Sequence, residues 1–277
     1  MEILIETFWD NLKLFPFLFV TYLCLEYMEH KTSEKALSFI KKARSSGPLI
    51  GSLCGALPQC GFAAAAANFY AAHIIGIGTL LAVFLSTSDE MLPIMISNAV
   101  APKLIIQLIA YKIICAVIFG YAAYFWTSKY YPRPPIDIEQ LCKNENCHCE
   151  NSIIIPALHH SVKITIFIFI ITLILNYALA AIDINIIAAY LRIPLLGEFL
   201  GGVAGLIPNC SSSVILTQLY LDGYINTGSL LSGTLVGGGV GLLVLFRVNR
   251  HWRENLKIAL LLFCCGILGG LCSYLFF

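Results

Sequence analysis

Two stretches of the same form decide how this chain is interpreted: Gly-Ala-Leu-Pro-Gln-Cys-Gly at Gly55–Gly61, and Gly-Leu-Ile-Pro-Asn-Cys-Ser at Gly205–Ser211. Each lies inside an apolar segment, Pro48–Ala72 in the first case and Pro194–Leu221 in the second. Proline ends a helix and the polar residue after it can start another, so both segments are predicted to be broken near their centres.

The segments around these stretches are apolar enough to lie in a membrane. The chain is 58% hydrophobic and only 12% charged, which is outside the range of a water-soluble domain. Crossing a bilayer takes roughly 20 apolar residues as helix. Six further segments meet this requirement: Leu12–Met28, Ile74–Ser97, Leu104–Trp126, Val162–Ala181, Ile225–Phe246 and Leu256–Phe277. The first is expected to be retained, because the N-terminus lacks the basic region of a signal peptide.

The whole chain repeats itself at an offset of 150 residues. The matched pairs include Lys13 and Lys163, Gly51 and Gly201, Gly55 and Gly205, Pro58 and Pro208, Cys60 and Cys210, Gly78 and Gly228, Cys115 and Cys265, and Gly120 and Gly270. Pro, Cys and Gly in one register are not explained by chance matches between apolar segments. The sequence therefore predicts a first repeat over 1–126, a linker over 127–156 and a second repeat over 157–277.

The two repeats are predicted to have opposite orientations in the membrane. Short cytoplasmic loops carry an excess of Lys and Arg. The loop after the first apolar segment is basic, at Lys31, Lys35, Lys41, Lys42 and Arg44, whereas its repeat equivalent carries only Arg192. The bias reverses in the last loop, with Arg247, Arg250 and Arg253 against Lys103 alone. We expect a multi-pass protein of the cytoplasmic (inner) membrane with a cytoplasmic linker and both termini outside.

An inverted repeat needs an odd number of crossings in each half, which favours re-entrant hairpins over single kinked spans at the two Pro-containing breaks. Hairpins entering from opposite sides would bring both tips to the midplane, where transporters of this kind bind their solutes. The tips offer Gln59, Cys60, Asn209, Cys210, Ser211, Ser212 and Ser213 as candidate binding residues. The alternative is two Pro kinks that only shape packing.

A second polar run, Ser86-Thr87-Ser88-Asp89-Glu90, interrupts the apolar segment Ile74–Ser97. Its repeat equivalent, 236–240, is Val-Gly-Gly-Gly-Val, which can unwind without polar side chains. Ionisable residues inside a span are costly and are functional candidates. Ser86, Ser88, Asp89 and Glu90 are therefore predicted to bind a solute cation or a transported proton, unless the run is a surface loop between two short spans.

Lys112 lies midway along the apolar segment Leu104–Trp126, too deep for its ammonium to reach the interface easily. One interpretation pairs it with Asp89 or Glu90. The other has it face an anion together with helix N-termini. The sequence leaves both open.

The linker contains a separate group of soft ligands, Cys142, Cys147, His148 and Cys149. Three thiols and an imidazole in so short a segment could hold a thiophilic metal. The spacing is not that of a standard zinc site, and a solvated loop that contains cysteine explains it equally well. Most of the other cysteines lie in apolar segments and are interpreted as small buried hydrophobes.

The motifs Pro58-Gln59-Cys60-Gly61, Gly78-Thr79-Leu80 and Phe84 to Glu90 resemble the ten-helix heavy-metal exporter family, which is related to the ArsP-type arsenic permeases. Members of that family are often labelled manganese transporters. The resemblance covers nearly the whole chain and implies ten helices and export of a metal or metalloid. Manganese would prefer Asp89, Glu90, Gln59 and Asn209, trivalent arsenic or a soft metal would prefer Cys60 and Cys210, and an oxyanion would use Lys112 and helix N-termini.

The leading hypothesis is a secondary exporter of a small inorganic solute, with no cofactor beyond a transported or regulatory metal ion. Coupling to a proton or another ion and assembly into a homo-oligomer are left open, and a net charge of +1 gives no reason to expect a nucleic-acid partner. The alternatives are an intramembrane enzyme acting on a lipid-borne substrate, and a passive channel or metal sensor. An enzyme would carry its catalytic residues on one half only, whereas the tip motif occurs in both.

Overall fold

The computed structural model describes residues 2–31, 45–88, 90–130, 154–180, 191 and 193–277. These residues form α-helices, one short 3-10 helix and no strand. Five described segments are long and apolar enough to cross a membrane, namely Ile77–Ser97, Pro102–Thr127, Ala157–Tyr177, Thr227–Val248 and Trp252–Leu275. The predicted class, an all-α polytopic membrane protein, is confirmed.

Both Pro-containing segments are broken, as predicted. The first consists of α3 (Gly47–Gly55) and α4 (Cys60–Ala71), and the second of α11 (Leu196–Gly205) and α12 (Cys210–Leu221). A helix of 9 to 12 residues is about 14–18 Å long, roughly half the thickness of the hydrocarbon core. None of these four helices can cross the membrane alone.

Two of the membrane-spanning segments are also broken near the middle. In the first, α5 (Ile77–Ser86) is followed by α6 (Met91–Ser97), and in the second, α13 (Thr227–Val236) is followed by α14 (Gly239–Val248). The hydroxyls of Ser86 and Thr87 donate to helix carbonyls one turn earlier, where such bonds compete with helix continuation. In the other break, Gly237 and Gly238 supply the non-helical residues.

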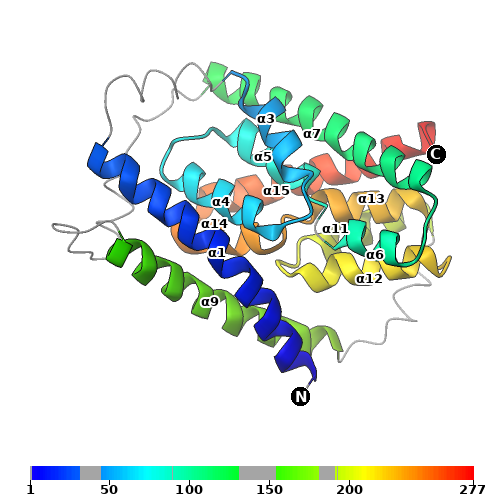
Figure 1. Cartoon of the computed structure of the whole chain (residues 1–277). Coiled ribbons are helices and arrows are strands. Elements are labelled where there is room, and N and C mark those ends of the chain that lie inside the picture. The colour runs from blue at the N-terminus through cyan, green and yellow to red at the C-terminus, as the bar shows by residue number, and fades with distance from the viewer. Residues whose placement is uncertain (1, 32–44, 89, 131–153, 181–190, 192) are drawn as a thin grey trace.

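Four long helices complete the described structure: α1 (Glu2–Lys31), α7 (Pro102–Tyr130), α9 (Ile154–Ala180) and α15 (Trp252–Cys272), which ends in the 3-10 helix η1 (Ser273–Leu275). α1 and α9 pack against each other along one flank of the molecule (Figure 1). The starts of α4 and α12, of α5 and α13, and of α7 and α15 all differ by 150 residues. The sequence repeat is thus a repeat of helices.

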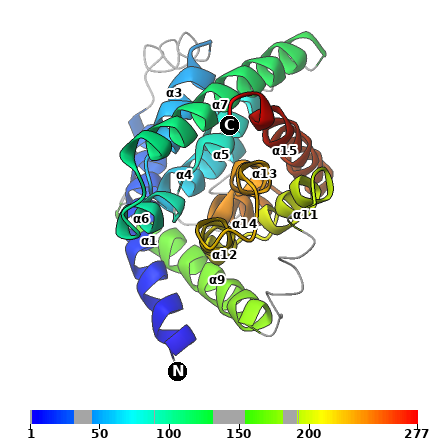
Figure 2. The same cartoon turned by 90° about the vertical axis from the view of Figure 1, so that its right-hand side faces the viewer.

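The centre of the bundle is formed by α5 and α13, which lie between α7 and α15 (Figure 2). Leu80 and Leu81 of α5 and Leu230 and Leu231 of α13 are all fully buried. By contrast, α7 exposes a stripe of isoleucines at 106, 114 and 118. Because this stripe recurs at helical spacing on the outside of the bundle, it is suited to contact lipid.

Glycines allow the central helices to approach their neighbours closely. A Cβ atom added to Gly78 of α5 would lie 2.5 Å from the carbonyl oxygen of Gly120 on α7. At the repeat equivalents, a Cβ atom on Gly270 of α15 would lie 2.7 Å from the carbonyl oxygen of Gly228 on α13. Small residues at helix contacts are the usual means of close packing in membranes, where water provides no driving force.

The two halves are interlocked by their short helices. α4 of the first half packs on α14 of the second, and α12 of the second half packs on α6 of the first. The contact is tight, because a Cβ atom on Gly241 would lie 2.7 Å from the Cβ atom of Ala63. Each tip helix is therefore held by the broken span of the opposite half.

We predict that Gly78→Val destabilises the α5–α7 contact by about 1–3 kcal/mol, because the larger side chain cannot be placed without moving the α7 backbone. The measurement is the thermal unfolding of the detergent-purified protein. The control is Ala122→Val at an exposed position of α7, the helix that Gly78 contacts. Its unfolding temperature should equal that of the wild type. Equal unfolding temperatures of the two variants would show that the close approach of α5 to α7 does not contribute to stability.

Candidate functional site

The two tip helices begin at the two cysteines of the repeated motif. Cys60 is the first residue of α4 and Cys210 the first residue of α12. The preceding residues, Gln59 and Asn209, are both extended, with φ −158° and −145°. Since Pro58 and Pro208 prevent continuation from α3 and α11, the chain restarts as helix at these points. Each thiol is thus placed at the N-terminus of a half-helix.

The two thiols lie next to each other. The Sγ atoms of Cys60 and Cys210 are 3.5 Å apart, and both residues are partly buried. A disulfide would need about 2.0 Å, so this contact is a hydrogen bond between sulfurs, which requires a proton on at least one of them. The two cysteines of the repeated motif are therefore neighbours, and the position of this contact at the membrane midplane stays a prediction.

Glu90 joins the pair and completes a cluster of three ligand groups. One carboxylate oxygen of Glu90 and the two sulfurs all lie within 4.8 Å of one another. Glu90 is the residue from which α6 starts, directly after the break in the first broken span. We call these three residues the Cys60–Glu90–Cys210 cluster. Two thiols and a carboxylate at this spacing can bind one metal or metalloid ion together.

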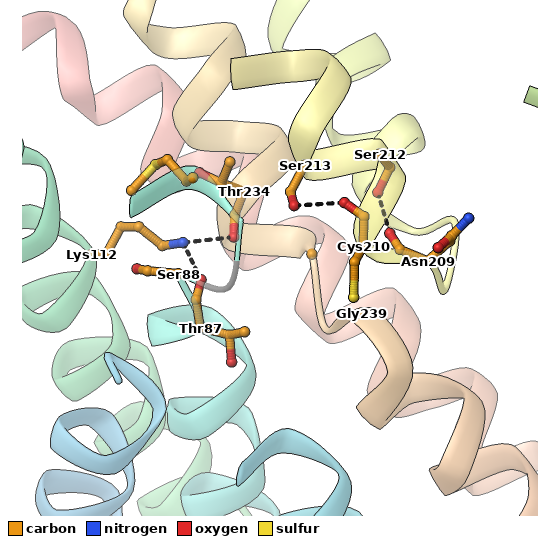
Figure 3. A pocket seen from close by; sticks show the side chains of 11 residues that line it. Thr87, Ser88, Lys112, Asn209, Cys210, Ser212, Ser213, Thr234 and Gly239 are labelled. Carbon is orange, nitrogen blue, oxygen red and sulfur yellow. Dashed lines mark hydrogen bonds between the residues drawn. The ribbon is translucent and has the colours of Figure 1, made fainter. Parts of the chain in front are cut away.

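A narrow pocket extends from Cys210 toward the middle of the bundle. Figure 3 shows Lys112 on one side of it and Cys210 on the other, with Asn209 beyond Cys210. Its free volume of about 10 Å³ holds about one water molecule. The residues that line it are Thr87, Ser88, Met91, Lys112, Asn209, Cys210, Ser212, Ser213, Thr234, Gly237 and Gly239. Both breaks of the central spans therefore contribute to the same small space, which suits an ion rather than an organic molecule.

Lys112 is fully buried, and its ammonium is held by main-chain oxygens. Nζ donates to the carbonyl oxygen of Thr87 and, at 3.0 Å, to that of Thr234. Thr87 follows the last residue of α5, and Thr234 lies in the last turn of α13. The C-terminal end of a helix carries a partial negative charge, so the ammonium lies where two such ends meet. The predicted pairing of Lys112 with Asp89 or Glu90 stays a prediction, and Asp89 lies outside the described residues.

The amide of Asn209 serves the tip helix and its neighbour α9. Its Oδ1 accepts from the backbone N–H of Ser211, which caps α12, and its Nδ2 donates to Oδ1 of Asn176 at 2.5 Å. Ser211 Oγ donates to the same Asn176 oxygen at 2.7 Å, and Asn176 in turn donates to Thr7 on α1 at 2.8 Å. Asn209 and Ser211 therefore anchor the second tip to the α1–α9 pair.

The other predicted hydroxyl groups are buried at the breaks and bonded within their own segments. Ser86 Oγ donates to the carbonyl of Ala82 at 2.9 Å, Ser88 Oγ to that of Ser86 at 3.1 Å, and Ser212 Oγ to that of Asn209 at 2.8 Å. Ser88 and Ser212 line the pocket, and Ser86 borders α3 at Gly55. Gln59 is half-buried, and within the described tip its side chain does not cap α4.

The remaining candidates lie outside the described residues: Asp89 at the break, and Cys142, Cys147, His148 and Cys149 in the linker. Sequence reasoning missed two polar residues that the structure uses. Asn176 was overlooked, although an amide inside the apolar segment Val162–Ala181 is a signal that could have found it. Glu198 is fully buried, where its carboxylate accepts from Leu195 N and from Tyr274 Oη at 2.6 and 2.7 Å, and it stabilises the start of α11.

The comparison with protein families gives one finding. A family model described as "Putative, 10TM heavy-metal exporter" (ArsP_2) matches residues 1–171. The matched part includes Cys60, Glu90 and Lys112, and the description does not name manganese. Searches of curated proteins and of solved structures found no match.

We predict that Asn209→Ala lowers the free energy of unfolding by about 1–2 kcal/mol, because it removes a helix cap and the hydrogen bond to Asn176. The matched variant is Gln59→Ala at the equivalent position of the first half, where no helix cap is lost. It should lower the free energy of unfolding by a smaller amount. Thermal or denaturant unfolding in detergent would compare the two. A larger effect of Gln59→Ala would contradict the assignment of Asn209 as an anchor.

Proposed function

The chain belongs to this ArsP_2 family, and we propose that it is a secondary membrane transporter that exports a thiophilic heavy metal or metalloid. The Cys60–Glu90–Cys210 cluster would be the site where the ion binds. The observation that carries the proposal is the 3.5 Å separation of two thiols contributed by the two halves of the chain. The family supports the transport function, and the ligand set of the cluster supports the chemical class of the solute.

The spacing of the sulfurs suits a single ion between them. A metal about 2.3 Å from each sulfur, the zinc–thiolate distance, would see two sulfurs 3.5 Å apart at an angle of about 100°. This is close to the tetrahedral angle and is also suited to a pyramidal trivalent centre. Thiolates prefer soft ions, whereas manganese prefers oxygen ligands, of which the cluster offers only the Glu90 carboxylate. The ligand set therefore supports a soft ion over manganese.

The electrostatic surroundings also suit a cation held by anionic ligands. The N-termini of α4 and α12 lie at the two cysteines, and the positive ends of these helix dipoles stabilise negative charge on the sulfur ligands. The ammonium of Lys112 donates hydrogen bonds to the carbonyls of Thr87 and Thr234. A metal would thus be bound by thiolates whose charge is supported by the surrounding helices.

We further propose that the two halves, 1–126 and 157–277, have inverted orientations, with the linker 127–156 in the cytoplasm and both termini outside the cytoplasmic membrane. The helix pairs at an offset of 150 residues and the mutual packing of each tip on the other half support this arrangement. Inverted repeats of this kind bind their solute at the midplane and expose it alternately to either side. Lipid and the inorganic solute are the expected partners, and a coupled proton or a homo-oligomer fits the same scheme.

A transporter explains the site better than an enzyme. An intramembrane enzyme would carry its catalytic residues on one half, but each half contributes one thiol to the cluster. A pocket with room for about one water molecule also leaves no space for a lipid-borne substrate in this conformation. Saturable transport driven by an ion gradient would separate the proposed exporter from a passive channel.

The first test is metal tolerance and cell metal content in a transporter-deficient host. The wild type should lower cell cadmium or arsenic after exposure to cadmium or arsenite, and Cys60→Ser and Cys210→Ser should each abolish this. The control is Cys264→Ser, which removes an exposed cysteine on α15 and should behave as wild type. Export of manganese that survives both cysteine substitutions would refute the soft-ligand site.

The second test follows from the thiol–thiol hydrogen bond, which requires at least one sulfur-bound proton. Metal binding by thiolates displaces such protons. Cadmium binding to the purified protein should therefore release at least one proton per ion in weakly buffered solution and should weaken as the pH is lowered. The double variant Cys60→Ser, Cys210→Ser should show neither effect. Proton release that is unchanged in this variant would place the binding site elsewhere.

A further inference from the structure

The buried ammonium of Lys112 lies where the broken ends of two half-helices meet. We propose that these ends form a site for a monovalent cation and that Lys112 fills this site permanently. Lys112 would then be a positioning residue that keeps both breaks in the geometry that the Cys60–Glu90–Cys210 cluster needs. The transport part of this inference rests on the proposed function, and the structural part does not.

The site is built from backbone oxygens that the helices cannot satisfy themselves. The last carbonyls of a helix have no intrahelical partner, and buried in a membrane they need one. Here the carbonyls of Thr87 and Thr234 converge on Nζ of Lys112. They come from α5 and α13, so one positive charge satisfies the negative ends of two helix dipoles. An apolar group of the same size would supply neither the charge nor the donors.

The same chemistry fits a metal cation of single charge. In transporters with discontinuous helices, unwound carbonyls and the C-terminal ends of half-helices coordinate the coupling sodium ion or proton. The hydroxyls of Ser88 and Thr234 line the same pocket. Both donate their protons to carbonyls of their own segments, to Ser86 O at 3.1 Å and Leu230 O at 2.9 Å, so their oxygens present lone pairs.

One tethered cation serves both halves. The repeat equivalent of Lys112 is Leu262, which is also fully buried. A dissociable ion would leave the site at low concentration and would share its pocket with a metal bound at Cys210. An ammonium on a side chain stays in place at any salt concentration. The inference therefore predicts that the wild type works without sodium or potassium.

The test compares Lys112→Ala with Lys112→Met in proteoliposomes, with cadmium as the transported probe. Alanine removes four atoms, Cγ to Nζ, which n-propylammonium can replace, whereas methionine fills the space with an uncharged chain. Wild-type transport should be equal in sodium, potassium and choline chloride. In choline chloride, the cadmium transport rate of Lys112→Ala should be lower than that of the wild type by about tenfold or more, because the buried carbonyls lose their charged donor. Addition of n-propylammonium should restore this rate. Lys112→Met should show the same reduced transport rate with and without n-propylammonium.

A second readout does not depend on transport. The melting temperature of detergent-purified Lys112→Ala should rise with n-propylammonium, and that of Lys112→Met should not. Cadmium binding to the cysteine pair, followed by ultraviolet thiolate-to-metal absorbance, tests the proposed function separately. If cadmium neither binds nor is transported, the proposed function fails, while amine-dependent stability still supports the cation site.

Three results would overturn the inference. The first is a sodium or potassium requirement of the wild type, which needs no variant and holds even if Lys112→Ala does not fold. The second is full transport by Lys112→Ala in choline. The third is a folded, cadmium-binding Lys112→Ala protein that neither n-propylammonium nor sodium restores or stabilises.

Discussion

The structure depends on one constraint: backbone that leaves the helical conformation in the interior of a membrane protein must still find hydrogen-bond partners. The described chain leaves the helix in four such places, two before the cysteines and two within the central spans. Each break exposes helix ends with opposite partial charges. The positive ends of α4 and α12 meet at the thiols, and the negative ends of α5 and α13 meet at Lys112. The breaks thus place the proposed ligand site and the proposed cation site on the same pocket.

The repeat explains why the site has paired parts, and departures from the repeat show where the halves differ. Cys60 and Cys210 are equivalent and meet. Gln59 and Asn209 are also equivalent, but only Asn209 caps its helix and bonds to Asn176. Lys112 is matched by Leu262 and Glu90 by Val240, so both charged groups of the described site come from the first half. The cysteines give the site its symmetry, and the charges make its two sides different.

Much of this arrangement could be predicted from the sequence, for physical reasons. Pro58 and Pro208 in one register mark breaks that proline enforces, and the apolar length of each segment fixes which helices can cross a membrane. The pairing of Cys60 with Cys210 followed from the offset of 150 residues. The acceptors of Lys112 could not be predicted, because Thr87 and Thr234 contribute backbone carbonyls, which every residue has. The role of Asn209 as an anchor to α9 also depended on a contact with Asn176 that no local pattern records.

Placing the two thiols on different halves has a consequence for the proposed transport cycle. An ion bound by both sulfurs is held only while the tips of α4 and α12 are adjacent. A movement that parted these tips would remove a ligand, so the affinity would fall without any change in the residues present. A ligand shifts a conformational equilibrium only by its difference in affinity between the two states. In the proposed cycle the cysteine pair would supply such a difference, because a bound ion would favour the state in which the tips meet and would be released from the state in which they part.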